Sequence, residues 1–138
     1  MAATRTASAV WNGTLQEGSG TVSLGSSAIG TYPVSWPART EEPNGVTSPE
    51  ELIAAAHAAC FSMALSADLE KAGTPAARVE TRAACTMDSV GGASKITRME
   101  LAVRGKVAGI DQAAFQKAAE GAKDNCPVSK ALKGNVEI

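Results

Sequence analysis

Three cysteines, Cys60, Cys85 and Cys126, are the side chains best suited to chemistry in this chain of 138 residues. They form no Cys-X-X-Cys pair and their number is odd, so the pattern does not indicate a disulfide framework. In a reducing compartment their thiols are of interest as nucleophiles, although a free cysteine commonly serves as a small buried apolar residue. Their spacing is compatible with either role.

The three cysteines lie in different local contexts. Cys85 shares one face of an alternating segment with Met87, which predicts burial in a strand. Cys126 precedes Pro127 at a predicted helix start, where unpaired backbone N–H groups and the helix dipole favour a thiolate. Cys60 has apolar neighbours in the middle of a helix, so burial is the simpler interpretation and a reactive Cys60–Cys126 pair is the alternative.

His57, Arg39 and Glu50 are the other candidates for chemistry. His57 precedes Cys60 by three residues, so both lie on neighbouring parts of a helix surface. A Cys–His pair or a zinc half-site is one interpretation, and a structural histidine is the simpler one. Arg39 lies in a charged loop and Glu50 at the second helical position, where the dipole favours a carboxylate, so both also fit solvated surface charges.

A long helix must position several of these side chains. The segment Ser-Pro-Glu-Glu at 48–51 predicts its start, with Ser48 as N-cap and Glu51 completing a capping box. The apolar run continues to Lys71, and Gly73 ends it. We expect this helix to be mostly buried. The stripe predicted to face the core is made of apolar residues at spacings of three or four: Ile53, Ala56, Cys60, Met63, Ala64 and Ala67.

Extended segments and further helices surround this helix. Residues 5–36 predict short strands separated by turns, and 38–48 predict a polar loop. Residues 77–90 and 94–107 predict an antiparallel hairpin that turns at Gly91-Gly92. A second helix begins at Asp111, a short one follows at Pro127, and the last four residues predict a strand or tail. This order predicts a single α+β domain, residues 1–138, with antiparallel sheets packed on a long central helix.

Composition disfavours several classes of partner. The 13 Lys and Arg against 14 Asp and Glu give a net charge of −1, so no basic excess favours nucleic acid or an anionic membrane surface. The N-terminus shows no signal-peptide pattern, and no later stretch reaches the ~18 consecutive apolar residues of a membrane span. We therefore expect a cytoplasmic protein. Aromatic residues make up only 4% of the chain, so small side chains must fill the interior and oligomerisation is expected.

Three segments carry a resemblance to a known family: NGTLQEGSGTV, SPEELIAAAHAACFSMALS and NCPVSKAL. In this order and spacing they resemble the OsmC branch of the OsmC/Ohr superfamily, the osmotically inducible and organic hydroperoxide resistance proteins. The resemblance extends from Trp11 to about Val136, and its two cysteine motifs are specific only in combination. It implies an OsmC/Ohr-like fold and an intertwined homodimer.

The resemblance also implies a thiol-dependent peroxidase for organic hydroperoxides, with hydrogen peroxide as a further substrate, in oxidative and osmotic stress defence. Cys60 would be the peroxidatic nucleophile and Cys126 the resolving thiol. Arg39 would supply positive charge, oriented by a bidentate pair with Glu50. No metal or other cofactor is implied, and an external dithiol such as a lipoyl dithiol would reduce the disulfide. Neither Cys85 nor His57 is given a catalytic role.

The spacing of Glu50 and Cys60 constrains how such a site is built. Ten residues of one helix correspond to ~15 Å along its axis, so the two side chains cannot meet within one straight helix. We therefore expect Glu50 to come from a partner subunit, with two sites related by two-fold symmetry. Two alternatives of other classes are a non-catalytic protein that binds a small apolar ligand around Cys60, and a zinc module built from His57 and the cysteines.

Overall fold

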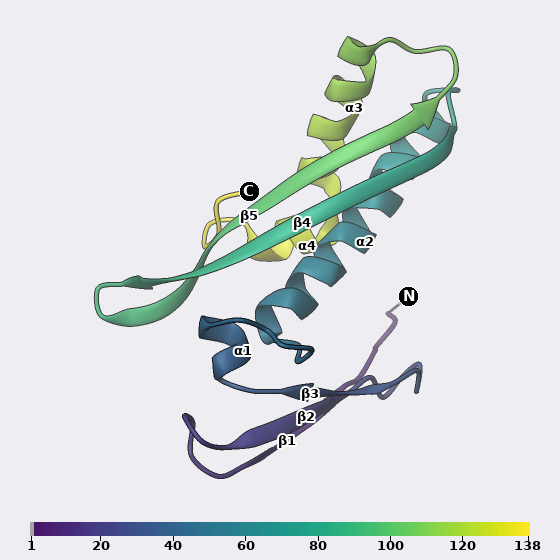
Figure 1. Cartoon of the computed structure of the whole chain (residues 1–138). Helices are drawn as coiled ribbons and strands as arrows, with labels where there is room; N and C mark the ends of the chain where they lie inside the picture. Colours follow the sequence, from purple (N-terminus) through teal and green to yellow (C-terminus); the bar gives the residue numbers. More distant parts are fainter. Residues whose placement is uncertain (1) are drawn as a thin grey trace. The chain divides into compact units, whose positions relative to one another are not determined.

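Strands and helices follow one another almost in the predicted order, with one short helix added (Figure 1). The computed structural model describes residues 2–138. Contacts within the chain divide it into two compact units, the first ending at Leu52 and the second comprising Ile53–Ile138. The assignment of residues 1–138 to a single domain stays a prediction.

The first unit contains a three-stranded antiparallel sheet. Its strands β1 (Ser8–Asn12), β2 (Ser19–Ser23) and β3 (Thr31–Val34) are hydrogen-bonded in the order β1-β2-β3. Gly20 of β2 lies opposite Trp11 of β1, and a Cβ atom at Gly20 would lie 2.7 Å from the indole ring. Glycine is therefore required where the indole crosses the strand.

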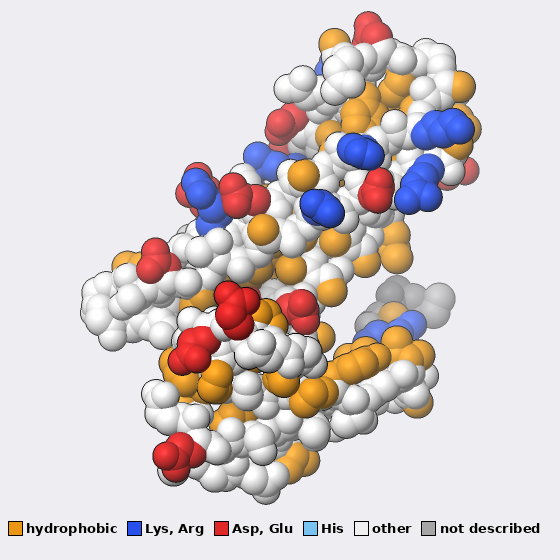
Figure 2. Space-filling model, in the orientation of Figure 1, with side chains coloured by type: hydrophobic (Ala, Val, Ile, Leu, Met, Phe, Trp, Pro, Cys, Tyr) orange, Lys and Arg blue, Asp and Glu red, His pale blue; other side chains and the backbone are white. Residues whose placement is uncertain are grey.

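Hydrophobic side chains gather on the surface of this first unit (Figure 2). Its large exposed side chains are apolar residues of the sheet and its turns: Val10, Trp11, Leu15, Ile29 and Tyr32. Among the described residues of this unit, Ala38 is the one buried hydrophobic side chain. A unit with so small an apolar interior gains little stability from its own burial.

A short helix lies in the segment 38–48, which was predicted to be a loop throughout. Helix α1 (Pro37–Thr40) begins with proline at its first position, where the missing N–H costs nothing. The Ala38 N–H donates to Ser35 Oγ at 3.2 Å. Arg39 is therefore held on a helical turn rather than on an extended loop.

Helix α2 (Pro49–Lys71) is uninterrupted and has the predicted ends. The Glu51 N–H donates to Ser48 Oγ at 3.2 Å, which confirms the N-cap. The Glu51 carboxylate accepts a hydrogen bond from the Thr47 hydroxyl. At the other end Gly73 has φ of +82°, and the following N–H groups return to the last carbonyls in the pattern of a Schellman motif.

The buried stripe of α2 differs from the predicted one. Beyond its first turn, the buried residues of α2 lie four apart along the helix: His57, Phe61, Leu65 and Leu69. Met63 is 71% exposed, and Ala56 and Ala67 are exposed as well, so the expectation of a mostly buried helix is wrong for the single chain. The helix is apolar on most sides, and its own second unit covers only one of them.

By length and composition α2 is also apolar enough to cross a membrane. A core helix meets the same criterion. Because its buried side packs against a sheet and helix of the same unit, we interpret it as a core helix.

A long hairpin and two C-terminal helices complete the second unit. Strands β4 (Ala76–Val90) and β5 (Ala93–Val107) pair antiparallel, as predicted. Their inner side chains pack against the core cluster, whose buried members are Phe61, Leu65, Leu69, Ala122 and Cys126. Cys85 faces inward opposite Met99, but it is half-buried rather than fully buried as expected. Charged side chains cover the outer face of the hairpin (Figure 2).

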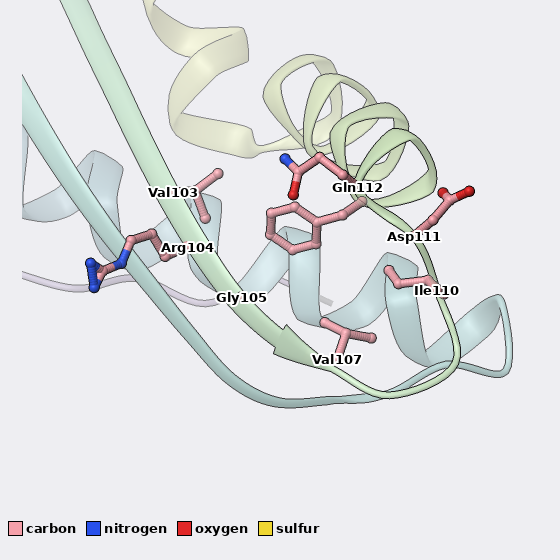
Figure 3. Close-up of a pocket in the computed structure, with 8 residues that line it drawn as sticks. Val103, Arg104, Gly105, Val107, Ile110, Asp111 and Gln112 are labelled. Atoms are coloured by element: carbon pink, nitrogen blue, oxygen red, sulfur yellow. The ribbon is translucent and has the colours of Figure 1, made fainter.

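Helix α3 (Gln112–Asn125) begins at its predicted cap, because Asp111 Oδ1 accepts a 2.8 Å hydrogen bond from Ala114 N–H. Its Phe115 ring sits against Gly105 of β5, where a Cβ atom would collide with the ring. Beside it lies a cavity of about 430 Å³. Among the residues that line this cavity, Val103 and Val107 point to the side of β5 that faces α3, whereas the Arg104 side chain points to the opposite side (Figure 3).

The chain ends with helix α4 (Pro127–Leu132) and a short contact with the hairpin. Glu137 forms a single parallel bridge with Arg98, and the Met99 N–H donates to the Glu137 carbonyl at 2.7 Å. The predicted last strand is therefore reduced to one bridge.

We predict that Leu65→Ala lowers the free energy of unfolding by about 3 kcal/mol, because it leaves a cavity where the side chain is fully buried. Val90→Ala, at the half-exposed end of the hairpin, should cost less than about 1 kcal/mol. Urea unfolding of the two variants measures both values. Equal losses would mean that Leu65 is not in the core.

Candidate active site

Cys60 and Cys126 come together in the second unit. Cys60 lies on α2, and Cys126 separates α3 from α4 and is completely buried in the core cluster. The Cys60 thiol donates a hydrogen bond to the Cys126 sulfur. Two sulfurs more than sixty residues apart in the sequence are thus direct neighbours, and both are free thiols.

The environment favours negative charge on Cys126 within this pair. Burial raises the pKa of Cys126, but hydrogen bonds from the Ser129 backbone N–H, the Cys60 thiol, the Ser129 hydroxyl and the Val128 N–H outweigh it, so the pKa is lowered. Burial raises the pKa of Cys60, and its hydrogen bond to Cys126 adds to this effect. The lowered pKa of Cys126 agrees in direction with the expected thiolate, which itself stays a prediction, whereas the raised pKa of Cys60 favours its protonated thiol.

Arg39 and Glu50 form a bidentate ion pair in the first unit. The Arg39 Nε–H donates to both Glu50 carboxylate oxygens at 3.1 Å, and Nη2 donates to Oε1 at 2.6 Å. The Glu50 side chain is only 9% exposed, so this ion pair is largely shielded from solvent on the carboxylate side. The expected orientation of the guanidinium by Glu50 is confirmed, and it occurs within one chain.

An apolar cavity adjoins the Arg39 guanidinium. The Trp36 ring lies beneath it, with 5.5 Å from the guanidinium carbon to the ring centroid, a cation–π contact. The cavity measures about 260 Å³. It is lined mainly by apolar residues of the first unit: Trp11, Leu15, Val34, Ser35, Trp36, Arg39 and Pro49. Sequence reasoning missed Trp36, although its position three residues before Arg39 at a helix start was a signal for this contact.

The ion pair and the sulfur pair belong to different units of the chain. Helix α2 carries both Glu50 and Cys60 without a break, so ten residues, or ~15 Å of axial rise, separate them. Supply of Glu50 to Cys60 by a partner subunit remains a prediction. Because Arg39 is bonded to Glu50, the two side chains would be supplied together.

His57 is a fully buried polar residue near Cys126. Its Nε2 lies 2.7 Å from Ser129 Oγ, and its Nδ1 has no hydrogen-bond partner among residues 2–138. Burial lowers the pKa of His57, so the ring is neutral at physiological pH. Ser129 was not singled out from the sequence, although it lies one turn after Cys126. Within the described part of the chain, no group of three His, Cys, Asp or Glu side chains could hold a metal ion.

Solved structures with the same arrangement of elements define the class of fold. An organic hydroperoxide resistance protein OsmC from Legionella pneumophila matches with a TM-score of 0.75 at 23% identity, covering 99% of this chain and 95% of that one. OhrB, the organic hydroperoxide resistance protein of Bacillus subtilis, matches with a TM-score of 0.69 at 26% identity, covering 96% and 93%. The chain thus has the mixed α and β fold of these proteins, with a long central helix and antiparallel sheets.

Sequence comparison gives the family. The model of the OsmC-like protein family matches residues 42–138. Peroxiredoxin OsmC of Escherichia coli is 41% identical over 128 residues, which cover 93% of this chain and 89% of that protein. The chain belongs to the OsmC-like family.

We predict that acid weakens the fold through its single histidine. Because burial lowers the pKa of His57, the unfolded chain binds a proton there more readily than the folded chain does, so stability falls as the pH decreases through the ordinary histidine pKa of about 6.5, from about 7 to about 5. The loss is at most about 1.4 kcal/mol per pH unit. Urea unfolding across this range should show the slope in the wild type and lose it in His57→Gln. An unchanged slope in the variant would assign the effect to other groups.

Proposed function

We propose that this protein is a thiol-dependent peroxidase that reduces organic hydroperoxides, with hydrogen peroxide as a second substrate. Two observations from relatives support the activity, since the relatives are named peroxiredoxin OsmC and organic hydroperoxide resistance protein. The observation that carries the mechanism is the hydrogen bond between the Cys60 thiol and the Cys126 sulfur. Two thiols in contact can supply the two electrons that cleave a peroxide bond.

In the proposed first step the Cys60 thiolate attacks one peroxide oxygen. The oxygen–oxygen bond breaks, Cys60 becomes a sulfenic acid, and the alkoxide leaves and takes a proton to become an alcohol. In the second step the Cys126 thiolate attacks the sulfenic sulfur, and hydroxide leaves and becomes water. A Cys60–Cys126 disulfide remains, which an external dithiol reduces by exchange.

The raised pKa of Cys60 supports a need for a nearby cation in the first step. Burial and the bond to Cys126 keep Cys60 protonated, so a cation must come close to it before it can attack. We propose that the Arg39 guanidinium is this cation. Its arrival would move the proton of the S–H···S bond to Cys126, and this proton would then be available to the departing alkoxide.

We propose that the Arg39–Glu50 pair reaches Cys60 from a partner subunit in a homodimer. Helix α2 keeps Glu50 about 15 Å from Cys60 of its own chain along the axis, which favours supply in trans. The exposed apolar side chains of the first unit and of α2, such as Trp11 and Met63, provide surface for a second copy to cover. Two-fold symmetry would give two equivalent sites.

The cavity beside Arg39 supports an organic substrate. An alkyl or aryl group fits its apolar lining, while the guanidinium would donate hydrogen bonds to the peroxide oxygens. We propose that the reaction uses these side chains without a bound metal, haem or flavin. Three cysteines that form no disulfide in the described chain also fit our proposal of a reducing, cytoplasmic location.

Peroxide consumption with dihydrolipoamide as reductant tests the chemistry. We expect Cys60→Ser to abolish turnover, because it removes the sulfur that attacks. Cys126→Ser should oxidise once per subunit and then stop at the sulfenic acid, detected by a dimedone adduct. Cys85→Ala is the matched control and should turn over like the wild type.

Full turnover in Cys60→Ser would refute the proposal. A wild-type protein that is inert toward every hydroperoxide but retains an apolar molecule would favour the alternative, a non-catalytic protein whose cavity beside Arg39 holds a small apolar ligand.

Mixed dimers test the supply of Arg39 in trans. Cys60→Ser and Arg39→Met chains, each inactive alone, are co-expressed with different tags and isolated as mixed dimers. If the partner supplies Arg39, one of the two sites contains both intact groups, and about half of the wild-type activity returns. If each chain uses its own Arg39, both sites are defective and no activity returns.

A further inference from the structure

His57 occupies a position that the proposed chemistry leaves unexplained. It is completely buried, and burial of a polar ring is costly unless its nitrogen atoms are paired. One nitrogen, Nε2, lies 2.7 Å from Ser129 Oγ, and Ser129 is itself buried, with only 4% of the residue exposed. The other, Nδ1, has no partner in the part of the chain that the structure describes. A buried histidine with one contact suggests that the contact itself has a role.

The unpaired Nδ1 indicates which nitrogen carries the proton. A neutral imidazole has one N–H and one lone pair. A buried N–H without an acceptor is rarer in proteins than a buried acceptor without a donor. The tautomer with hydrogen on Nε2 is therefore favoured, and His57 donates to Ser129 Oγ.

Donation by His57 directs the Ser129 hydroxyl. Because its oxygen accepts from His57, the hydroxyl hydrogen is left to point to another acceptor. The Cys126 sulfur, one turn earlier in the chain, is an acceptor for this hydrogen, and the hydrogen bond from the Ser129 hydroxyl lowers the pKa of Cys126. His57, Ser129 and Cys126 thus form a directed series of hydrogen bonds, which we call the relay. In such a series each hydrogen bond strengthens the others.

We propose that His57 is a positioning residue for Cys126. Through Ser129 it aims a hydroxyl hydrogen at the sulfur and so stabilises the thiolate that performs the resolving step. This role rests on the proposed function and extends it, because it separates the machinery of the two steps: Arg39 and Glu50 serve Cys60, and His57 and Ser129 serve Cys126.

The other groups around Cys126 do not replace the effect of the relay on its thiolate. Cys60 faces the sulfur from α2, and the hairpin contributes apolar side chains to the surrounding cluster, among them Val79, Leu101 and Val103. A cavity of about 200 Å³ that reaches Ser129 is lined by charged groups of α3, α4 and the following turn: Lys123, Asp124, Lys130 and Lys133. Lys123 is half-buried and the others are exposed, so solvent screens their charges more than it screens the buried hydrogen bonds.

The test is a titration of Cys126 as the sole cysteine, in the full chain with Cys60→Ser and Cys85→Ala. Serine at 60 keeps a hydroxyl donor toward Cys126. The ultraviolet absorbance of the thiolate is followed against pH, which needs no access of a reagent to the buried sulfur. Circular dichroism confirms that each variant is folded at the pH values used.

Three substitutions in this background separate the relay from packing. Ser129→Ala removes the hydroxyl, and His57→Leu removes the donor while filling similar volume. Each should move the titration midpoint of Cys126 upward by about one pH unit, equivalent to a tenfold loss of thiolate at neutral pH. His57→Gln keeps an N–H donor for Ser129 and should restore a midpoint close to that of the background protein.

An unchanged midpoint in Ser129→Ala, or equal shifts in His57→Gln and His57→Leu, would overturn the relay. If His57→Leu does not fold, Ser129→Ala decides the question, because it changes little volume. The titration does not depend on peroxide turnover. If the midpoints shift but the wild-type protein is inert toward hydroperoxides, the relay stands and the peroxidase is refuted. If the wild-type protein is active but the midpoints are unchanged, the peroxidase stands and the relay is refuted.

Discussion

The hydrogen bond between the Cys60 thiol and the Cys126 sulfur is the contact on which the proposed chemistry depends. It exists because the chain turns between α3 and α4 against the middle of α2, where the core cluster encloses Cys126. Two thiols in contact resist carrying two charges, so they share one. The surroundings of each sulfur then decide which one ionises more readily, and within one chain they favour Cys126, whose pKa is lowered while that of Cys60 is raised.

Helix α2 imposes the second constraint. It carries Glu50 at its first turn and Cys60 at its middle, and its rigidity keeps them apart. Both partners of the Arg39–Glu50 ion pair come from one chain, the Glu50 carboxylate is buried, and an apolar cavity lies beside Arg39. The Arg39–Glu50 pair of the first unit and the two sulfurs of the second unit are the components that the proposed homodimer would combine.

Local signals in the sequence predicted the helices and the hairpin well. Ser48, Pro49 and Gly73 act through hydrogen bonds and backbone angles within a few residues, so the ends of α2 were readable from them alone. The buried stripe of α2 was not readable, because apolar residues occupy most of its sides and only the packing of the hairpin and α3 selects one. Helix α1 was missed because its single turn lies in a polar segment.

The sequence by itself determined which side chains are available and the local structure that holds each one, since caps, turns and alternation act over a few positions. It also carried the motifs by which the family was correctly identified. The tertiary structure alone decided which groups meet: that Cys60 touches Cys126, that Trp36 lies under Arg39, and that His57 reaches Ser129. These contacts join residues of different elements, and their geometry follows from how whole elements pack rather than from spacing along the chain.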